Sequence, residues 1–220
     1  MNRLRPDLPP LPARMRKLPV SEAGYPVPWF VTWIKSAPEF RVITAEKIVI
    51  AHRRRLCWIC GSPLSAVGAF VLGPMCAVNR VNSEPPNHPD CARFAAQACP
   101  FLTTPARKRR EEGLPEGHGD LPGFVIKRNP GACAVWATKS WHTFDVDDGS
   151  LFKVGDPLFV EWYAEGRPAT YDEVKASIDS GLPILQQAAA IDGRGALGEL
   201  RELYERALTL LPRPVEVCPS

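Results

Sequence analysis

The stretch Cys57-Trp58-Ile59-Cys60-Gly61, together with His88-Pro89-Asp90-Cys91, decides the fold of this 220-residue chain. Two cysteines separated by two residues can bind one metal ion when the chain turns sharply, and Gly61 permits such a turn. The proline and aspartate of the second stretch are typical of a first helical turn, so its histidine and cysteine are expected on one face of a helix that continues to Cys99. The sequence therefore predicts one structural zinc ion (Zn2+) with four protein ligands, Cys57, Cys60, His88 and Cys91.

The order of these segments predicts a treble-clef-like zinc module. Residues 66–73 and 77–81 lie between the ligand pairs and have room for a β-hairpin, so a knuckle, a hairpin and a helix are expected in succession. Cys76, inside this hairpin, is an alternative third ligand in place of His88. The competing interpretation of the whole pattern is a set of buried free thiols, because cysteine is a common small core residue.

Composition narrows the class of protein. The hydrophobic share of 45% and the charged share of 23% are typical of a folded globular chain, and no apolar run is long enough for a secretory signal or a membrane span. We therefore expect a cytoplasmic protein with no membrane partner, whose reduced cysteines favour metal over disulfides. Of the seven cysteines, we interpret Cys99, Cys133 and Cys218 as core or tail residues. The net charge of +3 is too small to indicate nucleic-acid binding by itself.

We expect an α+β fold in which the treble-clef-like zinc module is joined to a small β-hairpin and helix unit. Four segments are predicted: an extended Pro/Arg-rich arm at 1–28, a strand plus the zinc module at 29–102, a linker or exposed loop at 103–123, and the β-hairpin unit with C-terminal helices at 124–220. The arm is interpreted as a solvated tail without a core of its own.

Two patterns predict strands. Residues 40–50 are rich in valine and isoleucine, which favour a strand that packs on the zinc module. Residues 124–146 and 151–163 are rich in valine, phenylalanine, tryptophan and threonine, and Asp147-Asp148-Gly149-Ser150 between them is typical of a tight turn.

Helices are predicted after these strands. Thr170 and Glu173 form a capping-box pattern, and Gly181 is expected to end the helix that they begin. A second short helix is expected after Pro183. Apolar residues then recur at spacings of three and four between 196 and 211, which predicts an amphipathic helix.

The zinc module also carries motifs that are similar to a family of uncharacterised zinc-binding proteins from bacteriophages and prophages. The likeness covers residues 25–211 and rests on these stretches: Cys57–Gly61, Phe70–Arg80 (FVLGPMCAVNR), Glu84–Pro86, His88, Cys91-Ala92, Cys99–Leu102, 155–162 and 166–170. The resemblance implies that the CxxC and HxxC residues are the metal ligands and that the protein acts in phage biology. It implies no particular reaction.

Two basic runs favour a nucleic-acid-binding module as the function. They flank the predicted finger and consist of Arg53, Arg54 and Arg55 before it, and Arg107, Lys108, Arg109 and Arg110 after it. Such runs can contact phosphates, and Trp58 and Trp141 can stack on bases. The competing interpretation is an ordinary solvated charged surface, because Glu111 and Glu112 partly cancel the second run.

Two further functions are considered. A protein-binding adaptor, acting on a host or phage protein, could dock its Pro9-Pro10-Leu11-Pro12 segment in an aromatic groove. A metal-dependent nuclease is disfavoured because four protein ligands close the metal site. His142 lies close to Asp145 and Asp147, but this acidic cluster is more typical of a turn than of a catalytic site. We therefore predict no catalytic residue.

Overall fold

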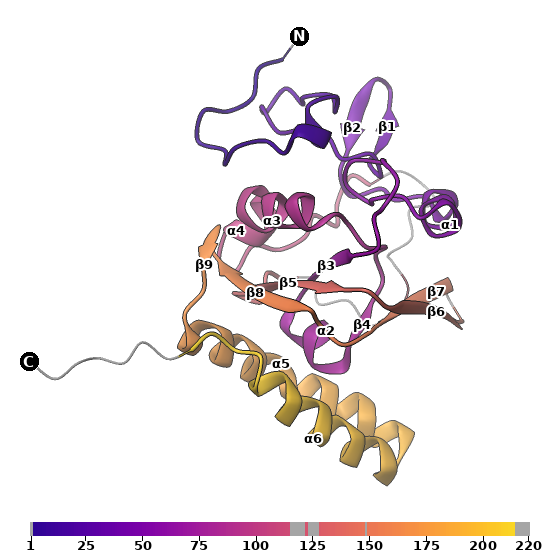
Figure 1. Cartoon of the computed structure of the whole chain (residues 1–220), viewed down its shortest axis with the longest axis vertical. Helices are drawn as coiled ribbons and strands as arrows, with labels where there is room; N and C mark the ends of the chain where they lie inside the picture. The colour runs from indigo at the N-terminus through magenta and orange to yellow at the C-terminus, as the bar shows by residue number, and fades with distance from the viewer. Residues whose placement is uncertain (1, 115–121, 123–127, 148, 214–220) are drawn as a thin grey trace, which may run out of the picture.

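The computed structural model describes residues 2–114, 122, 128–147 and 149–213 and shows a mixed α and β architecture (Figure 1). Parts of the predicted exposed loop at 103–123, part of the predicted strand region after 124, and Cys218 lie outside the described residues. None of the helices in the described ranges is long and apolar enough to span a bilayer.

A four-stranded antiparallel sheet forms the centre of the molecule. Its order is β3 (Gly68–Leu72), β5 (Cys133–Thr138), β8 (Phe159–Ala164) and β9 (Arg167–Pro168). All six residues of β5 are buried, because β5 has a neighbouring strand on each side and helices over both of its faces. This explains its apolar run Cys-Ala-Val-Trp-Ala, which lacks the alternation of a strand with one wet face.

Side chains that alternate along the strands bind two helical layers. Phe70 and Leu72 of β3 point to a cluster that contains residues of α5 (Tyr171–Asp192) and α6 (Arg194–Leu208), whereas Ala69 packs with α3 (Pro89–Ala98). Figure 1 shows the sheet between α3 on one side and the α5–α6 pair on the other. Strand β3 comes from the zinc-module half and β5 from the C-terminal half, so the two halves share one core.

An ion pair reinforces the α3 layer. The Arg93 guanidinium donates two hydrogen bonds to the Glu161 carboxylate of β8, at 2.7 Å each, and lies over the ring of Phe159 at 5.0 Å. This bidentate geometry fixes α3 on the sheet at the turns that follow Cys91.

Two smaller sheets flank the central one. Strands β6 (Trp141–Val146) and β7 (Gly149–Val154) pair as a hairpin with Val146 opposite Gly149, and the predicted turn falls between them. Strand β4 (Val81–Asn82) adds to β7. Strands β1 (Thr32–Ile34) and β2 (Ala37–Glu39) form a separate hairpin near the N-terminus.

Helix α1 (Ala45–Arg54) replaces the strand that was predicted at 40–50. Ile48 and Ala51, three residues apart, face the interior, and the Lys47 ammonium donates to the carbonyl oxygens of Trp29 (2.9 Å) and Val31 (2.8 Å). Packing at helical spacing has overridden the β propensity of the valine and isoleucine residues.

The predicted hairpin between the two ligand pairs is also wrong. Strand β3 forms as expected, but helix α2 (Pro74–Asn79) follows it, with Pro74 at its first position. Since β3 pairs with β5, the strand that was expected at 77–81 has no partner to form with. Two short helices complete the N-terminal half, the 3-10 helix η1 (Ala13–Met15) and α4 (Pro100–Thr103).

The capping box at Thr170 and Glu173 is confirmed, but α5 does not end near Gly181. It continues through Pro183 to Asp192, because Leu185 and Ala189 pack against the core and α6 lies along it. Gly181 is buried against α2, and a Cβ atom on it would lie 2.6 Å from Cγ of Met75. Close helix packing, and not chain termination, requires glycine at this position.

The contact at Gly181 gives a stability prediction. Gly181→Ala should lower the free energy of unfolding by about 1 kcal/mol or more, because overpacking against Met75 exceeds the gain in helix propensity. Gly198→Ala in α6 is the matched control, since a Cβ there meets nothing within 4 Å, and it should stabilise by up to about 1 kcal/mol. Urea unfolding measures both. Equal and stabilising effects of the two changes would contradict the packing explanation.

Candidate metal centre

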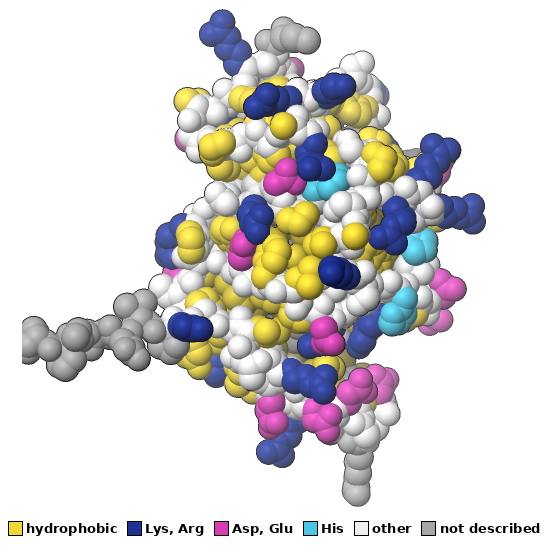
Figure 2. Space-filling model, in the orientation of Figure 1, with side chains coloured by type: hydrophobic (Ala, Val, Ile, Leu, Met, Phe, Trp, Pro, Cys, Tyr) yellow, Lys and Arg dark blue, Asp and Glu magenta, His cyan; other side chains and the backbone are white. Residues whose placement is uncertain are grey.

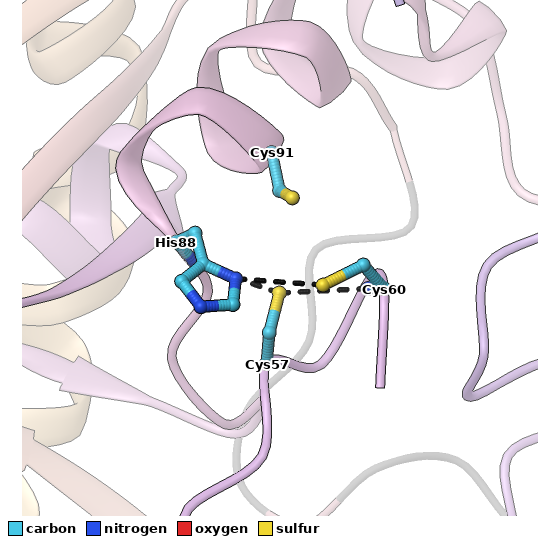
Figure 3. A group of neighbouring side chains, drawn as sticks. All are labelled: Cys57, Cys60, His88 and Cys91. Carbon is cyan, nitrogen blue, oxygen red and sulfur yellow. Dashed lines mark hydrogen bonds between the residues drawn. The ribbon is translucent and has the colours of Figure 1, made fainter. Parts of the chain in front are cut away.

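Four side chains converge beside α3. One ligand atom from each of Cys57, Cys60, His88 and Cys91 lies within 4.8 Å of the other three (Figure 3). The first two cysteines come from the turn between α1 and β3, His88 is the N-cap residue of α3, and Cys91 lies in its first turn. The structure thus brings together all four residues that the CxxC and HxxC spacing selected, and this compact group can hold a metal ion.

The knuckle that carries the first two cysteines is a tight turn. The Cys57 amide donates to the Ser62 carbonyl at 2.8 Å, and the Gly61 amide donates back to the Cys57 carbonyl at 2.9 Å. Gly61 has φ +71, and a Cβ atom on it would lie 2.6 Å from the Trp29 ring. Both the backbone conformation and the contact therefore require glycine.

Hydrogen bonds orient the His88 ring toward the sulfur atoms. Its Nε2 lies 3.0 Å from the Pro63 carbonyl oxygen, which can only accept, so Nε2 carries the proton. Nδ1 then presents its lone pair to the group, 3.4 Å from Sγ of Cys60. A second hydrogen bond of this kind is the usual way in which proteins fix the tautomer of a metal-binding histidine.

Asn87 joins the knuckle to the sheet. Its Oδ1 accepts from the Ile59 amide at 3.1 Å, and its Nδ2 donates to the Ala69 carbonyl at 3.3 Å. The side chain is buried, so both hydrogen bonds form away from water. The next residue is His88, whose amide lies 3.4 Å from Sγ of Cys57. Asn87 therefore sets the distance between the knuckle and the start of α3.

Electrostatics of the group favours a bound cation. Hydrogen bonding from Cys57, and then from Cys91, holds the pKa of the Cys60 thiol well below its usual range. The same contacts, first with Cys57 and then with Cys60, raise the pKa of the Cys91 thiol far above its usual range. One sulfur can therefore ionise readily only at the expense of the others. A divalent cation removes this conflict, because it stabilises all three thiolates together.

Cys76, the alternative third ligand, does not reach the group. It lies on α2, and burial raises the pKa of its thiol to about 11. Cys133 lies in the core on β5, where burial raises its thiol pKa to about 12. His142 is exposed on β6, and the described part of the chain holds no second cluster of three or more metal-binding side chains.

The N-terminal arm is packed over the metal group, contrary to the solvated tail that was predicted. Met15 is 1% exposed and lies in one cluster with Cys57 and Cys91. Arg14 forms an ion pair with Asp90 of α3 at 3.0 Å. Leu11, from the proline-rich segment, packs against the same cluster and is therefore engaged within the chain.

The first basic run lies at the end of α1. Arg53 and Arg54 are exposed, and the Arg55 guanidinium lies over the Trp141 ring at 4.8 Å. Trp58, which was predicted to stack on bases, is 1% exposed and already stacks on Phe30 at 4.9 Å. That prediction is wrong for Trp58, because a tryptophan beside a zinc knuckle is drawn into the small core around it.

The second basic run lines a large cleft. The cleft has a volume of about 990 Å³, and its cationic lining residues are Arg41, Arg107, Lys108, Arg109, Arg110 and Arg128. The acidic residues of the described lining are Glu22 and Glu84. The backbone holds the run in place, since Asn129 donates its amide to the Arg107 carbonyl at 2.7 Å and Lys108 bridges to Arg128. Residues 53–55 do not belong to this lining.

Two exposed aromatic residues of this cleft were not identified from the sequence. Trp33 of β1 is 47% exposed, Phe40 just after β2 is 45% exposed, and both line the cleft. The signal lay in the hairpin between them, whose turn residues Lys35 and Ser36 both have positive φ. Figure 2 shows the basic side chains of the face in view scattered among acidic ones, so the cationic cleft stands out by its lining and not by a basic patch on that face.

No family model, curated protein sequence or solved structure matches the chain. A function must therefore be argued from the metal group and the cleft.

The role of Asn87 can be tested by substitution. Asn87→Ala removes an acceptor and a donor from buried partners, so we expect the free energy of unfolding to fall by about 2 to 4 kcal/mol. Asn2→Ala, which removes one exposed hydrogen bond to Val20, should change stability by less than about 1 kcal/mol. Urea unfolding of both variants provides the measurement, and equal losses would contradict a special role for Asn87.

Proposed function

We propose that Cys57, Cys60, His88 and Cys91 bind one structural zinc ion and that the protein binds single-stranded nucleic acid in the adjacent cleft. Three sulfurs and one imidazole nitrogen are the donor set that zinc favours over magnesium or calcium. Four protein ligands leave no position for a substrate, which supports a structural ion. The knuckle followed by a helix that supplies two ligands supports a treble-clef-like arrangement, although the strand after the knuckle pairs outside the module.

Zinc removal provides the first test of this proposal. Purified protein should contain one zinc per chain by elemental mass spectrometry, and chelation should increase hydrogen exchange across residues 57–102, because ion binding supplies part of the folding free energy. Cys57→Ser should lose the ion. Cys76→Ser is the control and should keep it, because Cys76 lies outside the group. A folded wild-type protein without metal would overturn the assignment.

The lining of the cleft carries the nucleic-acid proposal. Six cationic residues and two acidic ones line it among the described residues, and Trp33 and Phe40 expose aromatic surface beside them. Proteins that bind single strands combine a cationic groove, which follows the phosphates, with aromatic side chains on which bases stack. A duplex hides its base faces, so this combination favours a single strand.

Not all of these cations are free for phosphate. Arg110 pairs with Glu39 of β2, and Arg109 lies over the Phe101 ring at 5.0 Å. Arg107 and Lys108 are exposed. These two residues are therefore the best candidates for direct phosphate contact, and Arg109 and Arg110 hold the run against the hairpin and α4.

A paired-variant experiment tests the binding site. The double variant Arg107→Ala/Lys108→Ala should bind a fluorescent single-stranded oligonucleotide more weakly than wild type at about 50 mM salt, and the loss of two phosphate contacts should flatten the salt slope by about 1.4. Arg53→Ala/Arg54→Ala removes the same charge outside the cleft and should leave the slope unchanged. Fluorescence anisotropy measures both. Equal losses in the two variants would show that bulk charge, and not the cleft, is responsible.

The setting of this function remains a prediction. The likeness to bacteriophage and prophage proteins concerns where the protein acts and leaves the chemistry of the cleft unchanged. A protein-binding adaptor also remains a prediction, but the arm segment on which it depended is packed against the metal group through Leu11.

A further inference from the structure

Glu84 brings an unpaired carboxylate to the wall of the cleft. It lies between β4 and α3, and its backbone carbonyl accepts a hydrogen bond from Asn82 Nδ2 at 2.9 Å, which fixes the turn. Among the described residues the side-chain carboxylate accepts no hydrogen bond and forms no ion pair, and it lines the cleft. Its function in the fold is therefore not to hold another residue.

The surroundings of this carboxylate are poor in compensating charge. Burial raises the pKa of Glu84, and the Arg109 charge acts in the opposite direction. The thiols of Cys76 and Cys99 feel the Glu84 charge and offer only weak hydrogen bonds. A buried acceptor without a donor costs free energy, so the site favours a ligand that supplies N–H groups.

The chemistry of a carboxylate selects among the bases. It has two oxygens side by side and can only accept hydrogen bonds, so it pairs best with two adjacent N–H donors. Guanine presents this pair, N1–H and the N2 amino group, on its Watson–Crick edge. Thymine and uracil present N3–H between two carbonyl oxygens, which the carboxylate repels. Adenine and cytosine offer one amino group next to a ring acceptor.

We propose that the cleft receives an unstacked guanine whose N1–H and N2 amino group donate to the Glu84 carboxylate. This inference rests on the proposed binding of a single strand, whose unstacked bases expose their Watson–Crick edges. Arg109, held over Phe101 at 5.0 Å, provides positive charge near the same carboxylate for the phosphate of that nucleotide. The cleft volume of about 990 Å³ lies at the upper end of ligand pockets, so a base and its neighbours can enter together.

The test compares two labelled oligonucleotides by fluorescence anisotropy. One is an oligothymidylate about twelve nucleotides long, and the other carries a single central guanine in the same sequence. Wild-type protein should bind the guanine strand about tenfold more tightly, which corresponds to about one hydrogen-bonded pair with a charged group. A third strand with inosine, which lacks the N2 amino group, should bind with intermediate affinity.

Glu84→Gln is the decisive variant, because it keeps the size of the side chain and replaces one acceptor by a donor. It should lose the preference for guanine and keep the affinity for oligothymidylate. Equal affinities of wild type for the two strands, or an unchanged preference in Glu84→Gln, would overturn the role of Glu84 while leaving single-strand binding in place. Failure of wild type to bind either strand would instead contradict the proposed function and this inference with it.

Discussion

Three sulfur atoms and one imidazole nitrogen lie within 4.8 Å of one another, and the packing of the N-terminal half is arranged around them. The knuckle, the first turn of α3 and the arm through Met15 all meet at this point. Their contacts are short, but the sulfurs oppose one another electrostatically, as the opposite pKa shifts of Cys60 and Cys91 show. A small core of this size depends on a cation to make the convergence favourable, because it buries too little apolar surface by itself.

The sequence predicted best what depends on neighbours along the chain. The four residues of the metal group, the capping box at Thr170 and the β6–β7 hairpin each follow from spacing within a few residues. Prediction failed where a distant segment decides. Residues 45–54 became a helix because Ile48 packs on the core, and α5 continued past Gly181 because α2 lies against it. In both places the local preference was correct in kind but weaker than the packing.

Candidate functional residues divide in the same way. The second basic run was visible in the sequence, but its neighbours in the cleft were not, because Trp33 and Phe40 come from a hairpin that precedes the metal group. Trp58 was the more obvious aromatic residue, and burial removes it. The metal group thus acts on the cleft indirectly: it fixes Trp58 beneath Phe30, and this stack forms part of the lining on which the hairpin is mounted.

The pairing of β3 with β5 also has a consequence for how the chain folds as it is synthesised. All four members of the metal group have been made by residue 91, whereas β3 obtains its neighbour only when residues 133–138 emerge, and β8 closes the other side of β5 later still. The N-terminal half can therefore assemble first and wait with an open strand edge, which is prone to pair with other chains. Helix α3 already covers one face of β3 during this interval, and early ligation would keep it there.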